Sequence, residues 1–369
     1  GYISGHANQA RITTFPLDDS KNCIYAKDVI SFAREKGWYN GTNKDFSFSD
    51  VYAPVDFGGA RFCDARVWAG FNKVASGMEK YTSYAKGLVE HGGENNFPTN
   101  RIPLWIKPDN KVSVQDVMSM MRDHFENTEL DMTRDLGAGP HGLPYRWRGL
   151  TWQVDSLNYC NERAISTQQT GFSFVAQCRN WLPDPIGGIL WFGVDDAYST
   201  CYAPMYCGIT EIPECFAVGN GDMLTYSETA AFWTFNLVTN FAYLRYDSMI
   251  KDVQKVQNEL ESKFVSYVPL IDKAAVSLLE NEGDNKAREF ITEYSINEAN
   301  NMTKTWKNLS QYLLIKYIDG NIKREKDGKF ERTEFGLPPG PLQPGYPDWW
   351  YEAIVKSTGD HFKVIGEGH

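Results

Sequence analysis

The sequence predicts an α+β protein with a strand-rich centre and a helical C-terminal addition. Apolar residues make up 42% and aromatic residues 14% of the 369 residues, as expected for a folded globular chain. Alternating apolar runs with short connections gather between residues 171 and 208. Helical apolar spacing dominates from residue 227 onward. These three observations give the fold class.

The N-terminal part mixes extended segments with short amphipathic helices. Residues 1–15 are predicted to form a strand. Residues 27–38 have helical apolar spacing that ends at Gly37, where glycine favours a helix stop. Residues 57–76 begin with a glycine turn and continue as an amphipathic helix.

The next region is predicted to be a capped helix followed by a loop. Ser113 and Asp116 form a capping box at the start of a Met-rich helix over 112–128. A Met stripe of this kind is typical of core packing. Residues 136–149 are too rich in Gly and Pro for regular structure, and their glycines lack the strand-to-helix setting of a phosphate-binding loop.

The centre and the C-terminal part contrast sharply. Residues 171–179, 189–196 and 198–208 are predicted to form adjacent antiparallel strands, because their connections are short. A single long helix is predicted over 227–264, where neither Pro nor Gly occurs. Further helices are predicted over 268–281 and 285–318, and then a Pro-rich tail, 336–350, whose two tryptophans could pin it to the surface.

Composition excludes several classes of function. The net charge of −10 argues against a nucleic-acid partner, and no apolar run is long enough to predict a membrane span. Seven cysteines with irregular spacing do not indicate a disulfide framework. Cys201, Cys207 and Cys215 lack a CxxC pattern and a nearby His, so buried free thiols are favoured over a zinc site. No metal or organic cofactor is predicted.

Two short stretches are more specific. The first is Ala7-Asn8-Gln9 in GHANQARI, and the second is VDFGGARFCDARVW, residues 55–68. In this order they resemble two segments of the N-terminal-nucleophile hydrolases of the penicillin V acylase and bile salt hydrolase kind. In those enzymes an Asn ends a strand, and an Arg stands in a turn just before a helix. Asn8 and Arg61 occupy the matching positions.

The wider resemblance is to the cysteine-nucleophile dipeptidases of the same superfamily. Four segments are similar to that branch and occur in the same order. They are ANQARI followed by an acidic stretch at 18–19, VISFAREKGWYN at 29–40, MRDHFENTELD at 121–131 and the block 167–208. The resemblance covers most of residues 1–245. It implies an αββα sandwich, two antiparallel sheets stacked between helix layers, which hydrolyses dipeptides.

The resemblance also implies a mechanism. The nucleophile is an N-terminal Cys whose own α-amine, with an ordinary pKa of about 8, acts as the base. Asn8 would supply a neutral donor that holds the oxyanion, and Arg61 a permanent positive charge that favours a nearby thiolate. The helix dipole does not favour a cation at a helix start, so Arg61 needs another reason to be there.

Ordinary structural roles compete with these assignments. An Asn beside a strand end is commonly a turn residue, and an Arg at a helix start is commonly salt-bridged. His124, on an apolar helix face, is interpreted as a satisfied core or interface histidine rather than a general acid. The acidic pair 195–196 is interpreted as a solvated corner rather than a paired-carboxylate site. Residues 145–148, with Tyr202 and Tyr206, could line a cleft or simply pack.

The nucleophile itself is missing from the pattern. In the family the Cys lies well upstream of the Asn strand, whereas Gly1 has no nucleophilic side chain and Cys23 carries no free amine. We therefore expect this chain to be the C-terminal portion of a longer enzyme. We also expect it to be inactive without the missing N-terminal portion.

The predicted organisation has three parts: residues 1–226 as the C-terminal part of the hydrolase domain, 227–320 as a long-helix extension and 321–369 as a tail. The expected substrate is a dipeptide. The alternatives are an N-acyl amide of the penicillin or bile-salt type, or a non-catalytic relative of the fold. Localisation stays open between cytoplasmic and secreted or periplasmic. A homo-oligomer is also open, since the long helix could pack within its own chain or across a dimer.

Overall fold

The computed structural model of the chain describes residues 1–147 and 149–366. It contains two compact units. The first unit is Gly1–Asp131 together with Arg146–Ile165. The second is Met132–Tyr145 together with the chain from Ser166 onward. Helices and small antiparallel sheets occur together, so the α+β prediction is confirmed.

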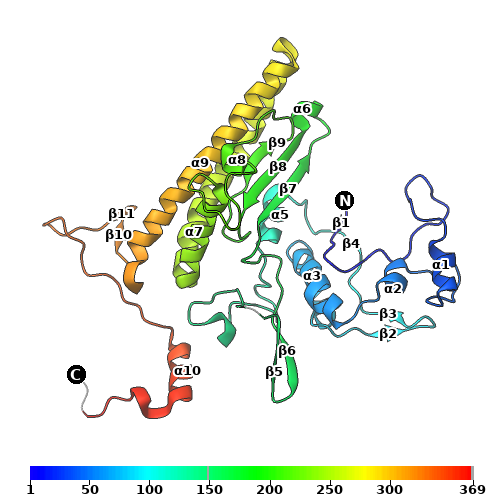
Figure 1. The fold of residues 1–369 in the computed structure, drawn as a ribbon, viewed down its shortest axis with the longest axis horizontal. Coiled ribbons are helices and arrows are strands. Elements are labelled where there is room, and N and C mark those ends of the chain that lie inside the picture. The colour runs from blue at the N-terminus through cyan, green and yellow to red at the C-terminus, as the bar shows by residue number, and fades with distance from the viewer. Residues whose placement is uncertain (148, 367–369) are drawn as a thin grey trace. The chain divides into compact units, whose positions relative to one another are not determined.

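The first unit consists of short helices and two-stranded antiparallel pairs (Figure 1). Its α-helices are α1 Val29–Glu35, α2 Phe48–Tyr52, α3 Ala65–Asn72, α4 Thr82–Ala85 and α5 Val114–Met121. Its strands are β1 Ile3–Ser4, β2 His91–Gly92, β3 Phe97–Pro98, β4 Trp105–Ile106, β5 Thr151–Val154 and β6 Leu157–Cys160. The pairs are β1 with β4, β2 with β3 and β5 with β6.

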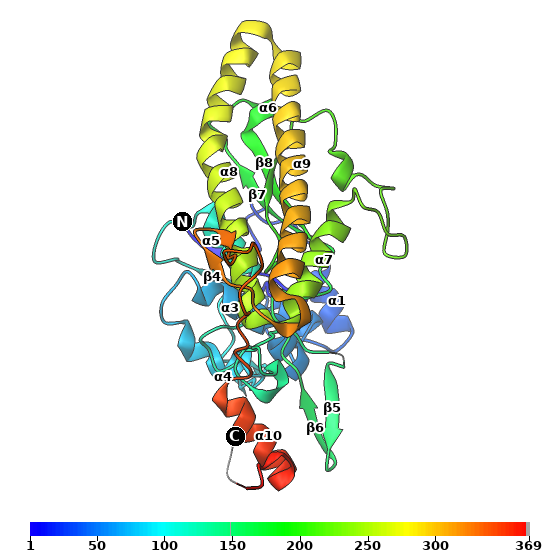
Figure 2. The ribbon, with the colours of Figure 1, turned by 90° about the vertical axis from the view of Figure 1, so that its left-hand side faces the viewer.

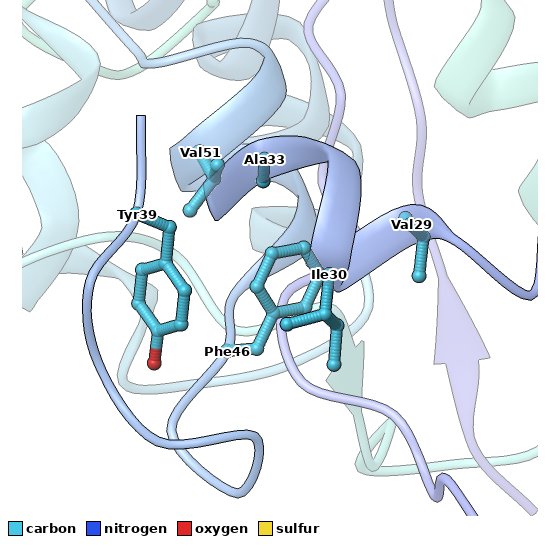
Figure 3. Close-up of a cluster of buried hydrophobic side chains, with 6 residues drawn as sticks. All are labelled: Val29, Ile30, Ala33, Tyr39, Phe46 and Val51. Carbon is cyan, nitrogen blue, oxygen red and sulfur yellow. The ribbon is translucent and has the colours of Figure 1, made fainter. Parts of the chain in front are cut away.

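A buried apolar cluster holds α1 in place. Figure 3 shows its members: Val29, Ile30, Ala33, Tyr39, Phe46 and Val51. The α1 members recur with helical spacing, so one face of the helix is buried, as the sequence predicts. The chain turns out of the helix at Gly37, which has a φ of 71° that favours glycine.

The predicted strand over residues 1–15 is wrong beyond β1, which pairs with β4 over two residues. The chain that follows stays extended but bonds to a helix. The carbonyl oxygens of Ile12 and Thr13 accept hydrogen bonds from the backbone N–H groups of Ser49 and Phe48 at 2.9 and 3.0 Å. Since these donors are the free N–H groups at the start of α2, no partner strand is needed.

Both helix predictions that follow are confirmed with shorter bounds. The region 57–76 contains a π-helical turn, Gly59–Asp64, that leads directly into α3. The capping box at the start of α5 forms, because Ser113 Oγ accepts from the Asp116 backbone N–H while the Asp116 carboxylate accepts from Ser113.

The β5–β6 hairpin has no counterpart in the sequence prediction. Its two turn residues, Asp155 and Ser156, have φ angles of 47° and 66°, as a two-residue hairpin turn requires. Trp152 and Tyr159 stack across the strands with ring centroids 6.0 Å apart. Asp-Ser is a weaker hairpin-turn signal than Asn-Gly, which explains why the sequence does not predict this hairpin.

The second unit is built on a three-stranded antiparallel sheet in the order β7-β8-β9. The strands are β7 Phe172–Cys178, β8 Gly188–Val194 and β9 Ala203–Tyr206. This confirms the predicted antiparallel strands. The third strand is shorter than the predicted 198–208 because a hydrogen-bonded turn follows Asp196.

Helices cover one face of this sheet (Figure 1). The predicted single helix over 227–264 is wrong, because Arg245 has non-helical φ and ψ angles of −150° and 70° and separates two helices. The Arg245 guanidinium donates to the Gly320 carbonyl oxygen at 2.9 Å, which holds the break. Figure 2 shows α8 and α9 as a long antiparallel hairpin. The helices are α6 Asp184–Gly187, α7 Ala231–Leu244, α8 Tyr246–Glu282 and α9 Asp284–Tyr317.

The two faces of the sheet differ. On the helix side, Val175 and Trp191 are 6% and 2% exposed, and the Tyr206 hydroxyl donates to Asp272 of α8. On the opposite side, Phe172 and Phe174 are 60% and 47% exposed. The sheet therefore presents an apolar face that the helices of this unit leave uncovered.

The remaining elements are small. They are β10 Glu325–Lys326, β11 Lys329–Phe330 and α10 Asp348–Thr358. None of the residues of α10 is fully buried, and of the tryptophan pair at its start, Trp349 is 42% exposed and Trp350 is partly buried. Within the described residues, no helix has both the length and the apolar character needed to cross a bilayer.

Candidate active site

The two segments singled out in the sequence meet in the first unit. Gln9 Nε2 donates to the Ala53 carbonyl oxygen at 2.7 Å. A Cβ atom on Gly59 would lie 2.4 Å from Gln9 Oε1, which is closer than atoms can approach. The Gln9 side chain, next to Asn8 in the sequence, therefore packs directly against the π-helical turn that carries Arg61.

Asn8 lies in an exposed bend beyond β1, and its partner is an arginine that the sequence analysis missed. Asn8 Oδ1 accepts a hydrogen bond from Arg66 Nη2 at 2.5 Å. A guanidinium can only donate hydrogen bonds, so this contact assigns the oxygen of the amide to the side facing Arg66. The amide NH₂ therefore points away from Arg66.

Arg61 is mostly buried and pairs with a carboxylate from a distant part of the chain. Its side chain is 12% exposed, and Nη2 lies 3.7 Å from Glu162 Oε1. Arg146 Nε lies 3.5 Å from the other oxygen of Glu162, so one carboxylate serves two guanidinium groups. Within the described chain, no hydrogen bond joins Asn8 to Arg61 directly. Neither Glu162 nor Arg146 has a local sequence signal for this contact.

A buried charge network supports both segments. The Asp64 carboxylate, fully buried, accepts from the Tyr84 hydroxyl at 2.6 Å and lies 3.1 Å from Arg11 Nη1 and 3.5 Å from Arg101 Nε. Burial and the Asp64 charge hold the pKa of Tyr84 well above its ordinary value. Arg101 also donates to the carbonyl oxygen of Ala10. The network thus links the π-helical turn to the residues just after Asn8.

Arg66 has further contacts. Its Nε donates to the Phe62 carbonyl oxygen at 3.0 Å, and the Cys63 thiol lies close enough to influence the pKa of its guanidinium. Burial, followed by the nearby Arg163 charge, lowers the pKa of Arg66 from its ordinary value. The site thus contains a thiol that sequence reasoning passed over, next to the arginine that holds Asn8.

Residues 2–259 match peptidase family C69. The chain belongs to peptidase family C69. This C69 chain is also similar to curated relatives named as dipeptidases. The probable dipeptidase of Salmonella dublin is 23% identical over 203 residues, which cover 55% of this chain and 39% of the relative.

Two further relatives come from lactic acid bacteria. The probable dipeptidase of Latilactobacillus sakei is 21% identical over 210 residues, 57% of this chain and 37% of the relative. Probable dipeptidase B of Lactococcus lactis subsp. lactis (strain IL1403) is 22% identical over 275 residues, 70% of this chain and 49% of the relative. The C69 chain thus spans less than half the length of each of these three relatives.

The acidic pair at the end of β8 is buried, so the expectation of a solvated corner is wrong. Asp195 and Asp196 are each 1% exposed. The Asp196 carboxylate accepts from the hydroxyls of Ser166, Tyr145 and Tyr243 at 2.9, 2.5 and 3.1 Å. Three hydroxyl donors replace water around this charge, which allows it to be buried.

The Asp195 carboxylate accepts fewer hydrogen bonds than that of Asp196. Its φ is 66°, and Oδ1 accepts from Asn236 Nδ2 at 2.9 Å. Its Oδ2 is buried, with no hydrogen-bond partner within the described chain. Burial raises the pKa of Asp195 to about 7. This carboxyl group is therefore a titrating group near neutral pH within the second unit.

His124 lies just beyond the end of α5 and is fully buried. Its Nδ1 lies 3.4 Å from Glu126 Oε1. Although burial opposes it, hydrogen bonding from His124 lowers the pKa of Glu126 to about 2. The core interpretation of His124 agrees with this burial, but its predicted place on a helix face is wrong.

The aromatic candidates of the second unit have packing roles. Tyr202 and Tyr206 are buried, and their hydroxyls bond to Ser173 at 2.8 Å and to Asp272 at 2.7 Å. Tyr145 is buried and bonds to Asp196, and Arg146 pairs with Glu162, whereas Trp147 is 70% exposed. Arg148 lies outside the described residues. No group of three or more His, Cys, Asp or Glu side chains suited to a metal ion occurs in the described part of the chain.

Proposed function

We propose that this C69 chain is part of a dipeptidase that cleaves the amide bond of dipeptides through a cysteine acyl-enzyme. Asn8 supplies an oxyanion donor and Arg61 supplies positive charge. The observation that carries the proposal is the Asn8 amide, whose oxygen Arg66 holds so that its NH₂ end is turned away from the guanidinium. The names of the three relatives support the choice of dipeptides.

Asn8 suits the chemistry of amide cleavage. When a thiolate attacks the carbonyl carbon, the carbonyl oxygen becomes an oxyanion. A neutral N–H donor that is already in place stabilises this charge, and removal of one such donor costs about 3–4 kcal/mol. The oxyanion then collapses, and the C–N bond breaks as the nitrogen takes a proton from the α-ammonium group of the cysteine, so that the amine leaves. Water, activated by the same α-amine, then hydrolyses the acyl-enzyme and restores the thiol.

Arg61 suits a supporting electrostatic role. Its guanidinium stays charged at all physiological pH values and favours the thiolate over the thiol. Glu162 divides its charge between Arg61 and Arg146, so the group of three side chains keeps a net positive charge. The proposed site therefore stabilises negative charge on the sulfur before attack and on the oxygen afterwards.

We place the attacking thiol outside residues 1–369, at the N-terminus of a preceding portion of the same protein. There the α-amine of the cysteine can act as the base, because its ordinary pKa of about 8 lies near neutral pH. Cys63 lies close to Arg66 but carries no free α-amine. Within this chain, Cys63 is the alternative candidate for the nucleophile.

The proposed fold is one half of an αββα sandwich. The β7-β8-β9 sheet has helices on one face and the exposed side chains of Phe172 and Phe174 on the other. Sheets in two-layer sandwiches bury an apolar face against a second sheet about 10 Å away. A second sheet, supplied by the preceding portion of the protein, would cover this apolar face and form the next layer of the sandwich.

The decisive test is Asn8→Ala in the full-length protein. We expect kcat for dipeptide hydrolysis to fall about 100-fold or more with little change in KM, because the lost donor acts mainly in the transition state. Asn22→Ala is the matched control, since Asn22 is an exposed turn amide that bonds to Asp19. Near-normal rates for Asn8→Ala would remove it from the site.

Three additional measurements separate the alternatives. Full-length Cys63→Ser should keep its activity, whereas loss of activity without loss of folding would move the nucleophile into this chain. Residues 1–369 alone should show no turnover. Comparison of dipeptides with penicillin and bile-salt amides then distinguishes a dipeptidase from an acylase. Inactivity of the full-length protein on every substrate would favour a non-catalytic relative.

A further inference from the structure

We propose that Arg66 is a positioning residue that fixes the orientation of the Asn8 amide, an inference that rests on the proposed oxyanion role of Asn8. Arg66 does not touch the substrate in this proposal. Its function is to decide which end of the amide faces the developing negative charge.

An exposed asparagine needs such a device. The oxygen and nitrogen ends of its amide have nearly the same shape but opposite hydrogen-bonding character. Asn8 lies in an exposed bend rather than in the packed core. In the wrong orientation, the amide oxygen would face the oxyanion and repel it. The catalytic value of Asn8 therefore depends on a group that recognises only its oxygen.

Arg66 has the required chemistry and rigidity. Its Nη2 donates to Asn8 Oδ1, and its Nε donates to the Phe62 carbonyl oxygen in the preceding turn. The two bonds leave from one planar guanidinium, so the anchoring bond fixes the direction of the other. Although burial and Arg163 lower the pKa of Arg66, an arginine begins from a value far above neutral pH and stays charged there.

The contact also strengthens Asn8 as a donor. A hydrogen bond from a charged donor draws electron density toward the amide oxygen and makes the amide N–H groups more positive. Arg66 therefore supports the oxyanion through Asn8 in two ways, by orientation and by polarisation. Both effects vanish if the Asn8 side chain is absent.

This dependence gives a double-mutant test in the full-length enzyme. We expect Arg66→Met to lower kcat by about 10–100-fold with KM changed by less than about threefold, and Arg66→Lys to recover part of the loss. In the Asn8→Ala background, Arg66→Met should cause no further loss, because the residue it acts through is gone. Additive losses, or an unchanged kcat for Arg66→Met, would overturn the proposal.

Arg163→Met is the matched control. Arg163 is exposed, and its charge acts on the same guanidinium. We expect its removal to change kcat by less than about twofold. An equal loss for Arg163→Met and Arg66→Met would indicate a general effect of positive charge and would contradict an orienting role.

A second readout does not require activity. In protein labelled with ¹⁵N at asparagine, the side-chain NH₂ signals of Asn8, assigned by their loss in Asn8→Ala, should shift in Arg66→Met and not in Arg163→Met. A shift without any change in kcat would show that the contact exists but does not serve catalysis, which overturns the positioning role of Arg66 and leaves the role of Asn8 to the Asn8→Ala test. Absence of a shift would defeat the contact itself.

Discussion

Two neighbouring aspartates in the second unit show how local hydrogen bonding decides the state of a buried carboxyl group. Asp196 accepts from three hydroxyls, whereas one oxygen of Asp195 lacks a partner within the described chain. Burial raises the pKa of Asp195 to about 7. The group therefore keeps its proton in the folded state at pH values where the unfolded chain has lost it.

This difference predicts a pH-dependent stability. The folded pKa of Asp195 lies above the ordinary value of 3.8, so its contribution is complete below pH 4 and is lost as pH rises toward 7. Asp195→Asn keeps the neutral shape, and asparagine tolerates the positive φ. At pH 8 the variant should be more stable than the wild type by about 4 kcal/mol, and near pH 4 roughly equal to it.

Urea unfolding of the chain at pH 4.5, 6 and 8 measures this effect. Asp196→Asn is the control, and it should destabilise at every pH, because it removes an acceptor from hydroxyls that stay buried. Parallel stability profiles for the wild type and Asp195→Asn would contradict the assignment.

At the scale of elements, α8 contains an internal proline. Pro269 lies within α8, is exposed, and leaves the helix without one backbone N–H. The sequence predicts a boundary between two helices in this region, but the packing of α8 against α9 keeps the helix continuous across it. Tertiary contacts thus outweigh a local penalty of about 3 kcal/mol.

Pro269→Ala should therefore stabilise the α8–α9 hairpin. The substitution restores a backbone hydrogen bond and removes the clash with the preceding turn, for an expected gain of roughly 1–3 kcal/mol in the free energy of unfolding. Thermal and urea unfolding, followed by helical circular dichroism, measure the gain. Ser266→Ala, at an exposed position in the same helix, should change stability by less than about 0.5 kcal/mol. An equal effect from both substitutions would be evidence against a proline penalty.

At the scale of the whole molecule, the β7-β8-β9 sheet exposes the apolar side chains of Phe172 and Phe174 on one face. Its exposed phenylalanines are arranged as in the interior of a sandwich, with Phe174 directly opposite Phe192 in the register. A single layer of helices leaves this surface in water, which is unfavourable for a large apolar patch. The proposed second sheet gives the surface a partner.

Phe174→Lys should therefore act in opposite directions in two proteins. In the chain of residues 1–369 it should reduce self-association without loss of helicity, because Phe174 is 47% exposed there. In the full-length protein it should prevent folding or activity, because an unpaired charge would be buried between sheets. Sedimentation and dipeptide hydrolysis provide the two readouts. Trp181→Lys, at a 74% exposed position in a turn, should be neutral in both. A full-length protein that tolerates Phe174→Lys would rule out a sheet at this face.

Some features of this protein follow from the sequence alone. The α1 helix and its stop at Gly37, the capping box of Ser113 and the alternation along β7 all depend on residues within a few positions of one another. Local propensity and side-chain periodicity act over that range, so these elements are predictable. The segments that identify the C69 family are also local patterns.

The tertiary structure alone decides the partners in the proposed site and the burial of charge. Arg66 with Asn8, and Glu162 with Arg61, are brought together by packing between segments far apart in the chain. The sequence marks Asn8 and Arg61 but carries no signal that couples either to its partner. Asp195 shows the same limit, because a buried and a solvated carboxylate have the same sequence. The physical reason is that contact and desolvation depend on the whole packed chain, whereas propensity depends on near neighbours.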